Sequence, residues 1–249
     1  MPKKENLEFL ISLYSNSVKN NRKESNTDLD VYEALLKWLF GDERTIEVCA
    51  RTAYRDVQRN LIGIGDDEVP QEKKQAWKEE IEKKITQCIE ELFIQNISEQ
   101  KEFDIWHKKT CEEICKISDK HNISKYLKNG FTDGIAQKQL NMTIKNMFVM
   151  DMEKWNEDLN KIKKYLHIPV DSYILQAASE KLGIEIINKK GKYSPYKGDV
   201  SKPWSKWNYD DYIKFQEDVR KAIAYPIADC PMDWEFSAWN ETKAKRENK

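Results

Sequence analysis

Asp171 is the residue whose surroundings point most directly to chemistry. It lies in the segment Leu166-His-Ile-Pro-Val-Asp-Ser-Tyr-Ile-Leu175, after an extended Pro-Val pair and before an apolar-periodic stretch that predicts a helix. An aspartate in this place accepts hydrogen bonds from N–H groups of the first helical turn, so we expect Asp171 to cap the helix. The helix dipole keeps such a carboxylate ionised. An ionised carboxylate can stabilise a sugar cation or activate a nucleophile, so capping and catalysis are compatible here.

The segment Phe131-Thr-Asp-Gly-Ile-Ala-Gln-Lys138 is the second informative stretch. It joins two predicted helices, at about 123–129 and 135–150, through a turn that holds glycines. Two helices joined in this way form a helix-hairpin-helix. Small turn residues let a phosphate backbone approach, and the N–H groups that open the second helix can bind an anion. The turn residues expected to contact DNA are Gly130, Gly134, Ala136 and Gln137.

Together these segments resemble the helix-hairpin-helix DNA glycosylase superfamily, with its endonuclease-III-like or 8-oxoguanine-glycosylase-like fold. Gly134-Ile-Ala-Gln-Lys138 is similar to the Gly-Val-Gly-x-Lys turn of that family. Ile168-Pro-Val-Asp-Ser-Tyr-Ile174, followed by Lys181-Leu-Gly-Ile184, is similar to its Val-Pro-Val-Asp-x-His-Val and Arg-Leu-Gly-Leu segments. The resemblance covers about residues 120–185, and the segments follow in the family's order. No four-cysteine motif follows, so the resemblance is to members without an iron–sulfur cluster.

The resemblance implies an enzyme that excises a damaged or modified base from double-stranded DNA after flipping the nucleotide out of the duplex. Lys138 matches the lysine that attacks the sugar in bifunctional members, where a Schiff base allows strand cleavage. Asp171 matches the aspartate of mono- and bifunctional members, which stabilises positive charge on the sugar. Lyase activity, and a role in repair or in defence against phage, stay open. The resemblance implies no cofactor beyond a monovalent cation at the hairpin.

The chain departs from the family pattern at several positions. Ala136 replaces the second glycine of the turn, and Asp133 replaces the usual proline. Asp133 would face phosphates with the wrong charge, so we expect it to bind a cation or to turn away. The 32 residues between Lys138 and Asp171 are more than is usual in the family. Lys145, two helical turns after Lys138, is the alternative nucleophile.

Basic and aromatic residues outside these segments indicate where DNA could bind. Four of the seven arginines are spaced as one stripe on a predicted helix at about 43–61, and their planar guanidinium groups suit phosphate. These are Arg44, Arg51, Arg55 and Arg59. The segment 188–207 carries six lysines, among them Lys202 and Lys206, against one aspartate. Its aromatic residues could stack on bases, since lysines and rings alternate.

Several residues are predicted to line the pocket for the flipped base. The segment 188–207 contributes Trp204 and Trp207, and His167 adjoins Asp171 in sequence. Aromatic density near the C-terminus adds Trp234, with Trp239, Asp229 and Asp233 as neighbours of the same cleft. The alternative function is a non-catalytic helical module that binds nucleic acid or a protein partner through the segment 188–207.

Composition predicts an all-α fold. Only 8 glycines and 7 prolines occur in 249 residues, which disfavours turn-rich sandwiches and barrels, while 27 aromatic residues supply a core. Apolar periodicity predicts further helices, listed here with those above: 5–20, 29–40, 71–97, 100–119, 153–165, 172–183, 209–224 and a short one after Ala228, with a frayed end over the last nine residues. We expect two helical subdomains that flank a cleft. The predicted divisions are an N-terminal part at 1–120, the hairpin and Pro-Val-Asp part at 121–185, and C-terminal helices at 186–249 that pack on the first part.

Charge and cysteine usage limit the function classes. The formal net charge of −1 excludes a basic field over the whole chain, so DNA must be bound through local segregation of charge. Five cysteines, an odd number, favour reduced thiols in a cytoplasmic protein, and no zinc spacing is present. No apolar run of membrane-spanning length occurs, so we expect no membrane partner. We expect a monomer.

Overall fold

The computed structural model describes residues 28–61, 69–184, 203–223, 228 and 230–248, and this part of the chain contains helices and no strand. The all-α prediction is therefore confirmed. The helices are α3 (Asp28–Phe40), α4 (Ile46–Gln58), α5 (Gln71–Ile94), α6 (Gln100–Lys120), α7 (Asp133–Met150), α8 (Asn156–Ile162), α9 (Ser172–Leu182), α10 (Tyr209–Ala222) and α11 (Pro231–Glu247). Short 3₁₀ turns lie between them: η1 (Ser124–Tyr126), η2 (Glu153–Trp155), η3 (Lys163–Tyr165) and η4 (Trp204–Lys206).

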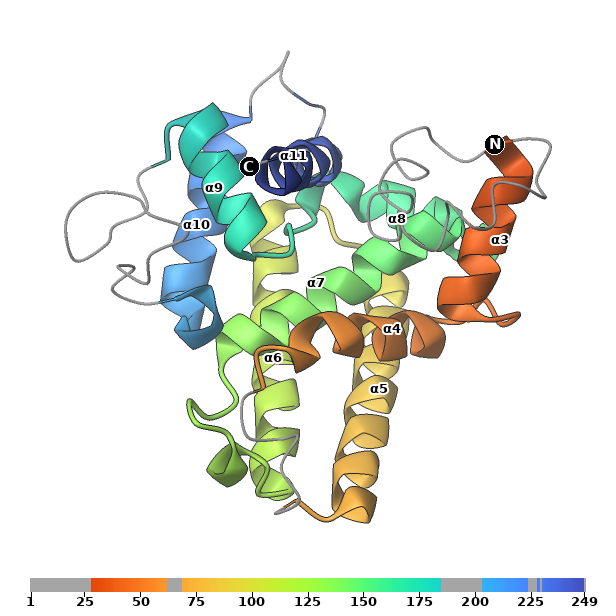
Figure 1. Ribbon diagram of the computed structural model, residues 1–249, viewed down its shortest axis with the longest axis vertical. Helices are drawn as coiled ribbons and strands as arrows, with labels where there is room; N and C mark the ends of the chain where they lie inside the picture. Colours follow the sequence, from red (N-terminus) through yellow and green to blue (C-terminus); the bar gives the residue numbers. More distant parts are fainter. Residues whose placement is uncertain (1–27, 62–68, 185–202, 224–227, 229, 249) are drawn as a thin grey trace.

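Helix α7 is the centre of the fold. It packs against α4 on one side and α6 on another, and α5 and α6 form a long pair that extends away from it (Figure 1). Helices α9, α10 and α11 gather at the other end of the molecule (Figure 1). Within α7 every residue except Asp133 and Phe148 is buried. A helix covered on all sides must pair its polar side chains internally or use them for function, which makes its lysines conspicuous.

Helices α4, α7, α9 and α10 begin at side-chain caps that are visible in the sequence. Thr45 and Thr132 each accept a hydrogen bond from a backbone N–H of the turn that follows, at the starts of α4 and α7. Asn208 forms a reciprocal capping box with Asp211 at the start of α10. Asp171 caps α9, as the sequence predicts. These caps fix where the chain enters each helix, and so fix the starting points of the side chains that form the site.

Several predicted boundaries are wrong. The stretch 123–129 is only the 3₁₀ turn η1, so the hairpin's first helix is α6. The stretch 153–165 is divided into η2, α8 and η3. The C-terminal helix runs to Glu247, where a frayed end was expected, because its last turn is anchored: Arg246 donates a 2.7 Å hydrogen bond to the carbonyl oxygen of Ser172. The predicted helix at 5–20 and most of the segment 188–207 lie outside the described residues.

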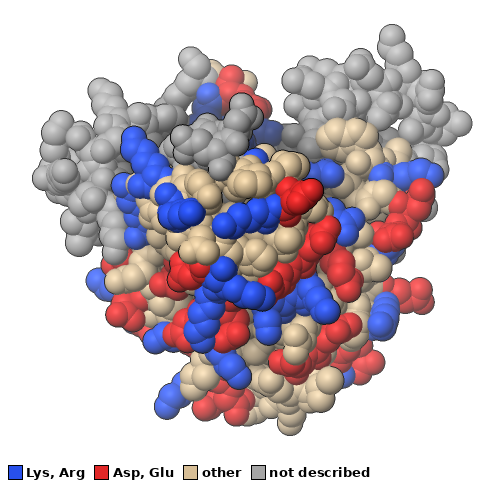
Figure 2. All heavy atoms as spheres, turned by 90° about the horizontal axis from the view of Figure 1, so that it is seen from below, with Lys and Arg blue, Asp and Glu red and all other residues tan. Residues whose placement is uncertain are grey.

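The surface seen from below, around the free ends of α5 and α6, carries mixed charge. Basic and acidic side chains alternate over this face, and they form no large area of one sign among the residues drawn in colour (Figure 2). This distribution agrees with the near-neutral total charge. None of the described helices has both the length and the apolar character that crossing a bilayer requires.

Candidate active site

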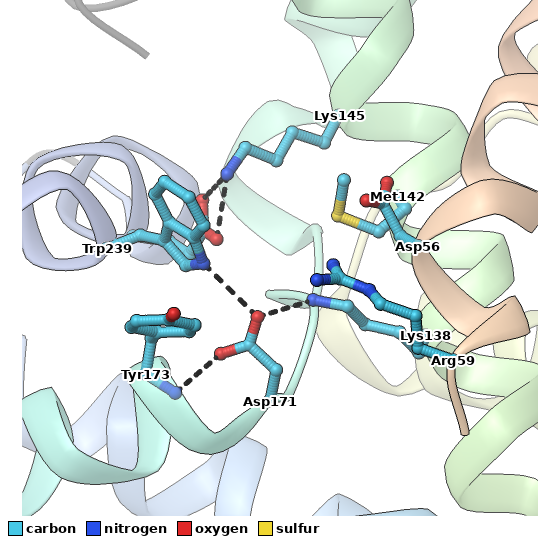
Figure 3. A pocket seen from close by; sticks show the side chains of 9 residues that line it. Asp56, Arg59, Lys138, Met142, Lys145, Asp171, Tyr173 and Trp239 are labelled. Carbon is cyan, nitrogen blue, oxygen red and sulfur yellow. Dashed lines mark hydrogen bonds and ion pairs between the residues drawn. The ribbon is translucent and has the colours of Figure 1, made fainter. Parts of the chain in front are cut away.

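A pocket opens between α4 and α7 on one side and α9 and α11 on the other (Figure 3). Its volume is about 430 Å³, with the space at the open mouth included. The residues that line it are Asp56, Arg59, Lys138, Met142, Lys145, Asp171, Tyr173, Glu235 and Trp239. Six of these nine residues are Asp, Glu, Lys or Arg, which is unusual for a space beside a protein core.

Lys138 and Asp171 meet in this pocket. The Nζ atom of Lys138 lies 2.9 Å from Oδ2 of Asp171, although 32 residues separate the two in the chain. Their side chains are only 7% and 16% exposed, so the pair is largely shielded from water but still reaches the pocket. The start of α7 supplies the lysine and the start of α9 supplies the aspartate. The long intervening segment therefore does not keep the two residues apart.

Asp171 is held by four donors. Its Oδ1 accepts hydrogen bonds from the backbone N–H groups of Tyr173 and Ile174, at 2.9 and 3.0 Å. Its Oδ2 accepts from Lys138 and from the indole N–H of Trp239, the latter at 3.2 Å. Burial raises the pKa of Asp171, but the Lys138 ammonium and the N–H of Ile174 outweigh it, so the pKa lies below its ordinary value. The carboxylate is ionised at neutral pH.

Lys145 and Glu235 form a second pair deeper in the same wall. Nζ of Lys145 lies 2.9 Å from Oε1 and 2.6 Å from Oε2 of Glu235, and both side chains are only 1% exposed. Burial lowers the pKa of Lys145 and raises that of Glu235, while each partner opposes the shift of the other. As the sequence predicts from their spacing, Lys145 and Lys138 face the same pocket. Lys145 is the more enclosed of the two.

The remaining wall residues supply aromatic surface and a second accessible carboxyl group. The rings of Tyr173 and Trp239 lie 5.3 Å apart at an angle of 48°, on the side of α9 and α11. Met142 lies on α7 between the two lysines. On the opposite side, α4 brings Asp56 and its end brings Arg59 to the pocket. None of Asp56, Tyr173 and Glu235 was expected in the site.

The hairpin turn does not present its backbone to a ligand as predicted. The N–H of Gly134 donates to the carbonyl oxygen of Trp207 at 3.0 Å, and the N–H of Ala136 donates to that of Thr132 at 2.9 Å. A Cβ atom on Gly134 would lie 2.0 Å from the carbonyl oxygen of Trp204. The close approach that requires glycine is therefore made by the protein's own η4 segment, and the expected phosphate contact of these residues is wrong in this structure.

Other hairpin residues are also engaged within the protein. Gln137 is buried and donates to the carbonyl oxygen of Gly134, at 2.8 Å, so it is not available to DNA. Gly130 remains partly exposed in a left-handed conformation, with a φ of +68°. Asp133 turns away from the proposed DNA side, which is one of the two outcomes expected for it: it accepts a 3.1 Å hydrogen bond from the N–H of Tyr209. A cation at the hairpin stays a prediction.

The four residues predicted for the base pocket do not line it. His167 is buried between Asp104, at 2.7 Å, and the hydroxyl group of Tyr212, at 2.9 Å. Burial lowers the pKa of His167 to about 4 even though Asp104 opposes the shift, so the ring is neutral. The indoles of Trp204, Trp207 and Trp234 are all buried in the core. Of the expected aromatic residues that the structure describes, only Trp239 reaches the pocket.

The predicted basic residues have different positions. Arg59 lies at the pocket, and Arg55 is exposed one helical turn before it on α4. Arg51 is exposed but pairs with Glu82 at 3.3 Å, and Arg44 pairs with Glu33. Lys206 is exposed in η4. Lys202 and Asp229 lie outside the described residues, and Asp233 pairs with Lys163 at 2.6 Å, away from the pocket lining.

No set of three or more His, Cys, Asp or Glu side chains with metal-binding geometry occurs in the described ranges. The ion pairs of the pocket are lysine–carboxylate pairs, which suit proton transfer and charge stabilisation. No family model, no curated protein and no solved structure matches the chain. The resemblance to the helix-hairpin-helix glycosylases therefore stays a prediction, and function has to be argued from the pocket itself.

Proposed function

We propose that the chain is a DNA glycosylase that excises a damaged or modified base from a nucleotide flipped into the pocket. The observation that carries the proposal is the 2.9 Å contact between Lys138 and Asp171 at a pocket. A lysine and an ionised aspartate, both mostly shielded from water, are the two groups that cleavage of a glycosidic bond by an amine requires. The order of the sequence segments around them supports the same interpretation.

Asp171 acts electrostatically in this mechanism. Positive charge develops on the sugar as the bond between C1′ and the base breaks, and a fixed carboxylate near C1′ lowers the energy of that state. Two backbone N–H groups and the Trp239 indole hold the Asp171 carboxylate in one orientation. The group is therefore arranged before the substrate binds and needs no reorganisation during the reaction.

Lys138 supplies the nucleophile for lyase activity. After losing a proton, its Nζ attacks C1′, and the resulting aminal opens to a Schiff base with the sugar. The Asp171 carboxylate, 2.9 Å away, hydrogen-bonds this nitrogen and stays charged, while the proton passes to water. Lys145 is the less suitable nucleophile, because its amine is fully buried against Glu235. In a monofunctional enzyme, water attacks C1′ instead and Lys138 only orients Asp171.

The remaining pocket residues support recognition of a flipped base in DNA. The rings of Tyr173 and Trp239 offer aromatic surface against which a base can pack. Arg59 lies at the pocket, and Arg55, one helical turn before it on α4, is exposed. We place the phosphate contacts on these two arginines, and not on the N–H groups of the hairpin.

Borohydride trapping on a duplex with an abasic site tests the proposal. A Schiff base between a lysine and the aldehyde of the abasic sugar forms with loss of water, and borohydride reduces it to a stable amine. We expect a covalent adduct with the wild-type chain and none with Lys138→Gln. Lys116→Gln, a change at an exposed lysine of α6, is the matched control and should trap normally.

Base release from duplexes with single lesions separates the two enzyme types. Release that survives Lys138→Gln but is lost in Asp171→Asn indicates a monofunctional glycosylase; asparagine keeps the helix cap, so the loss would report on charge. A trapped adduct that survives Lys138→Gln and is lost in Lys145→Gln would move the nucleophile to Lys145. No adduct and no base release on a broad panel would contradict the proposal and favour a binding module.

A further inference from the structure

Asp56 is the pocket carboxyl group that the mechanism above does not use. It lies on α4 and lines the pocket together with Arg59. Its side chain faces the pocket from the wall opposite α9, with Lys138 between it and Asp171 (Figure 3). It is partly buried, and no hydrogen bond or ion pair within the described part of the chain engages its carboxyl group.

The lack of a partner distinguishes Asp56 from the other two acids of the pocket. Asp171 accepts four hydrogen bonds, and Glu235 is paired with Lys145. A partly buried carboxyl group without a partner is costly for stability, and such groups persist mainly where function requires them. No residue in the described ranges engages either oxygen of Asp56, and both face the pocket side of α4.

The surroundings of Asp56 and Asp171, the two accessible carboxyl groups, shift their pKa values in opposite directions. Burial raises the pKa of Asp56; the charges of Lys138 and Arg59 reduce the shift without cancelling it. Lys145 acts in the same sense as these cations, and the Asp171 carboxylate raises the pKa of Asp56 further. Asp171 itself has a lowered pKa. Two carboxyl groups separated in this way are the usual arrangement of a proton donor and a charged stabiliser at one site.

We propose that Asp56 is the general acid of the pocket, which protonates the departing base while Asp171 remains ionised. The inference rests on the proposed glycosylase function. The electron pair of the C1′–N bond stays on the base as that bond breaks. The Asp56 hydroxyl group delivers its proton to a ring nitrogen or carbonyl oxygen of the base, which leaves neutral. Asp56 becomes a carboxylate, stabilised by Arg59 and Lys138, and recovers a proton from water.

This assignment also concerns the class of substrate. An acid at the base is useful only when the base leaves as a neutral molecule that would otherwise depart as an anion. The pocket therefore suits neutral damaged or modified bases with a basic ring nitrogen or carbonyl oxygen near α4. Bases that already carry a positive charge leave without a proton, and Asp56 would give them no advantage.

The test compares base release with abasic-site trapping in Asp56→Asn. Duplexes carrying 8-oxoguanine, hypoxanthine or uracil report on base release, and an abasic duplex with borohydride reports on Lys138 without any leaving base. General acids contribute about 10²- to 10⁴-fold. We expect Asp56→Asn to slow release of the accepted base by a factor in that range while trapping stays within about twofold of wild type. Preserved trapping also shows that the variant is folded.

The pH profile adds a readout that a structural role would not change. In the wild type, single-turnover base release should fall as pH rises through the pKa of Asp56, and Asp56→Asn should lose that limb. The charged groups that face Asp56 are Arg59, Lys138, Lys145, Asp171 and Glu235. They all influence the pH at which this limb occurs, but the limb should be lost only when Asp56 itself is replaced. Glu47→Gln, at an exposed position of α4, is the matched control and should behave as wild type.

The outcomes distinguish this inference from the proposed function. Normal base release by Asp56→Asn overturns the general-acid role and leaves the glycosylase assignment intact. Equal losses of base release and trapping also overturn it, because they place Asp56 in binding or folding. If the wild-type chain releases none of the three bases and traps no abasic site, the proposed function fails and the role of Asp56 fails with it.

Discussion

Two lysine–carboxylate pairs on one face of α7 differ mainly in their access to the pocket. In the outer pair, Lys138 and Asp171 are 7% and 16% exposed, whereas Lys145 and Glu235 of the inner pair are both 1% exposed. The outer carboxylate has three further donors besides its lysine. For the Glu235 carboxylate, Lys145 is the single hydrogen-bonding partner within the described residues. The outer carboxylate thus keeps hydrogen-bond donors if its lysine moves, while the inner carboxylate does not.

This difference indicates that the two ion pairs along α7 have different roles. An ion pair that has solvated neighbours and several donors can change partners during a reaction at little cost. A fully enclosed pair cannot, because a single buried charge is strongly unfavourable. We infer that the outer pair is the reactive one and that the inner pair holds α11, with Trp239 on it, against α7. Each prediction below would break or sharpen that distinction.

The largest effect is expected when the inner pair loses one member. Lys145→Met leaves the Glu235 carboxylate buried without its cation, which typically costs about 3–5 kcal/mol. Lys138→Met should cost less than Lys145→Met, since Asp171 keeps its backbone and indole donors. Urea unfolding followed by circular dichroism measures both values.

The double variant Lys145→Met, Glu235→Leu sharpens this result. Replacing both members of a buried pair by apolar groups is often close to neutral, so the double variant should recover most of the lost stability. If Lys138→Met proves as destabilising as Lys145→Met, the two pairs do not differ in the way proposed here.

The parts of the site that the sequence predicts depend on local patterns. The position of Asp171 follows from an N-cap signal, and that of Lys138 from its distance to the hairpin turn. The shared face of Lys138 and Lys145 follows from a separation of seven residues on one helix. Each of these inferences needs only a few neighbouring residues. The all-α fold likewise follows from composition and apolar periodicity.

The parts that could not be predicted depend on contacts between distant segments. Asp56 and Glu235 reach the pocket because α4 and α11 pack on opposite sides of it, and no local pattern marks Asp56. Glu235 and Trp239 are four residues apart, so they share a helix face. The prediction that Trp234 lines the pocket did not use this spacing. A glycine in a hairpin turn can make room for a phosphate or for another part of the protein. At Gly134 the close neighbour is the η4 backbone.

A smaller effect is expected when the outer pair loses its cap. Asp171→Ala removes the hydrogen bonds to the first turn of α9 and should cost about 1–2 kcal/mol. Asp171→Asn keeps an oxygen for the same N–H groups, so it should cost less than the alanine variant. Thermal unfolding of the two variants side by side makes the comparison. Equal losses would mean that charge, and not capping, accounts for the contribution of Asp171 to stability.

The smallest effect is a difference between the pH windows of the two pairs. The pKa of Asp171 is below its ordinary value of 3.8 in the folded chain, so its stabilisation is complete above that pH and is lost as pH falls through the folded value. The gap between wild type and Asp171→Asn should therefore stay constant from pH 7 to about pH 5 and close only at lower pH.

The stability contribution of the inner pair should change at a higher pH. The cause is opposite, because the pKa of Glu235 is raised whereas that of Asp171 is lowered. Burial raises the pKa of Glu235 above its ordinary value of 4.5, and in Lys145→Met the lysine no longer opposes that shift. The folded variant then binds a proton more tightly than the unfolded chain, so its stability deficit shrinks as pH falls toward the raised pKa. Urea midpoints measured between pH 7 and pH 4 would show this closing gap for Lys145→Met while the Asp171→Asn gap is still open. If both gaps close together, the two carboxylates share one environment, and the distinction between a reactive outer pair and a structural inner pair is lost.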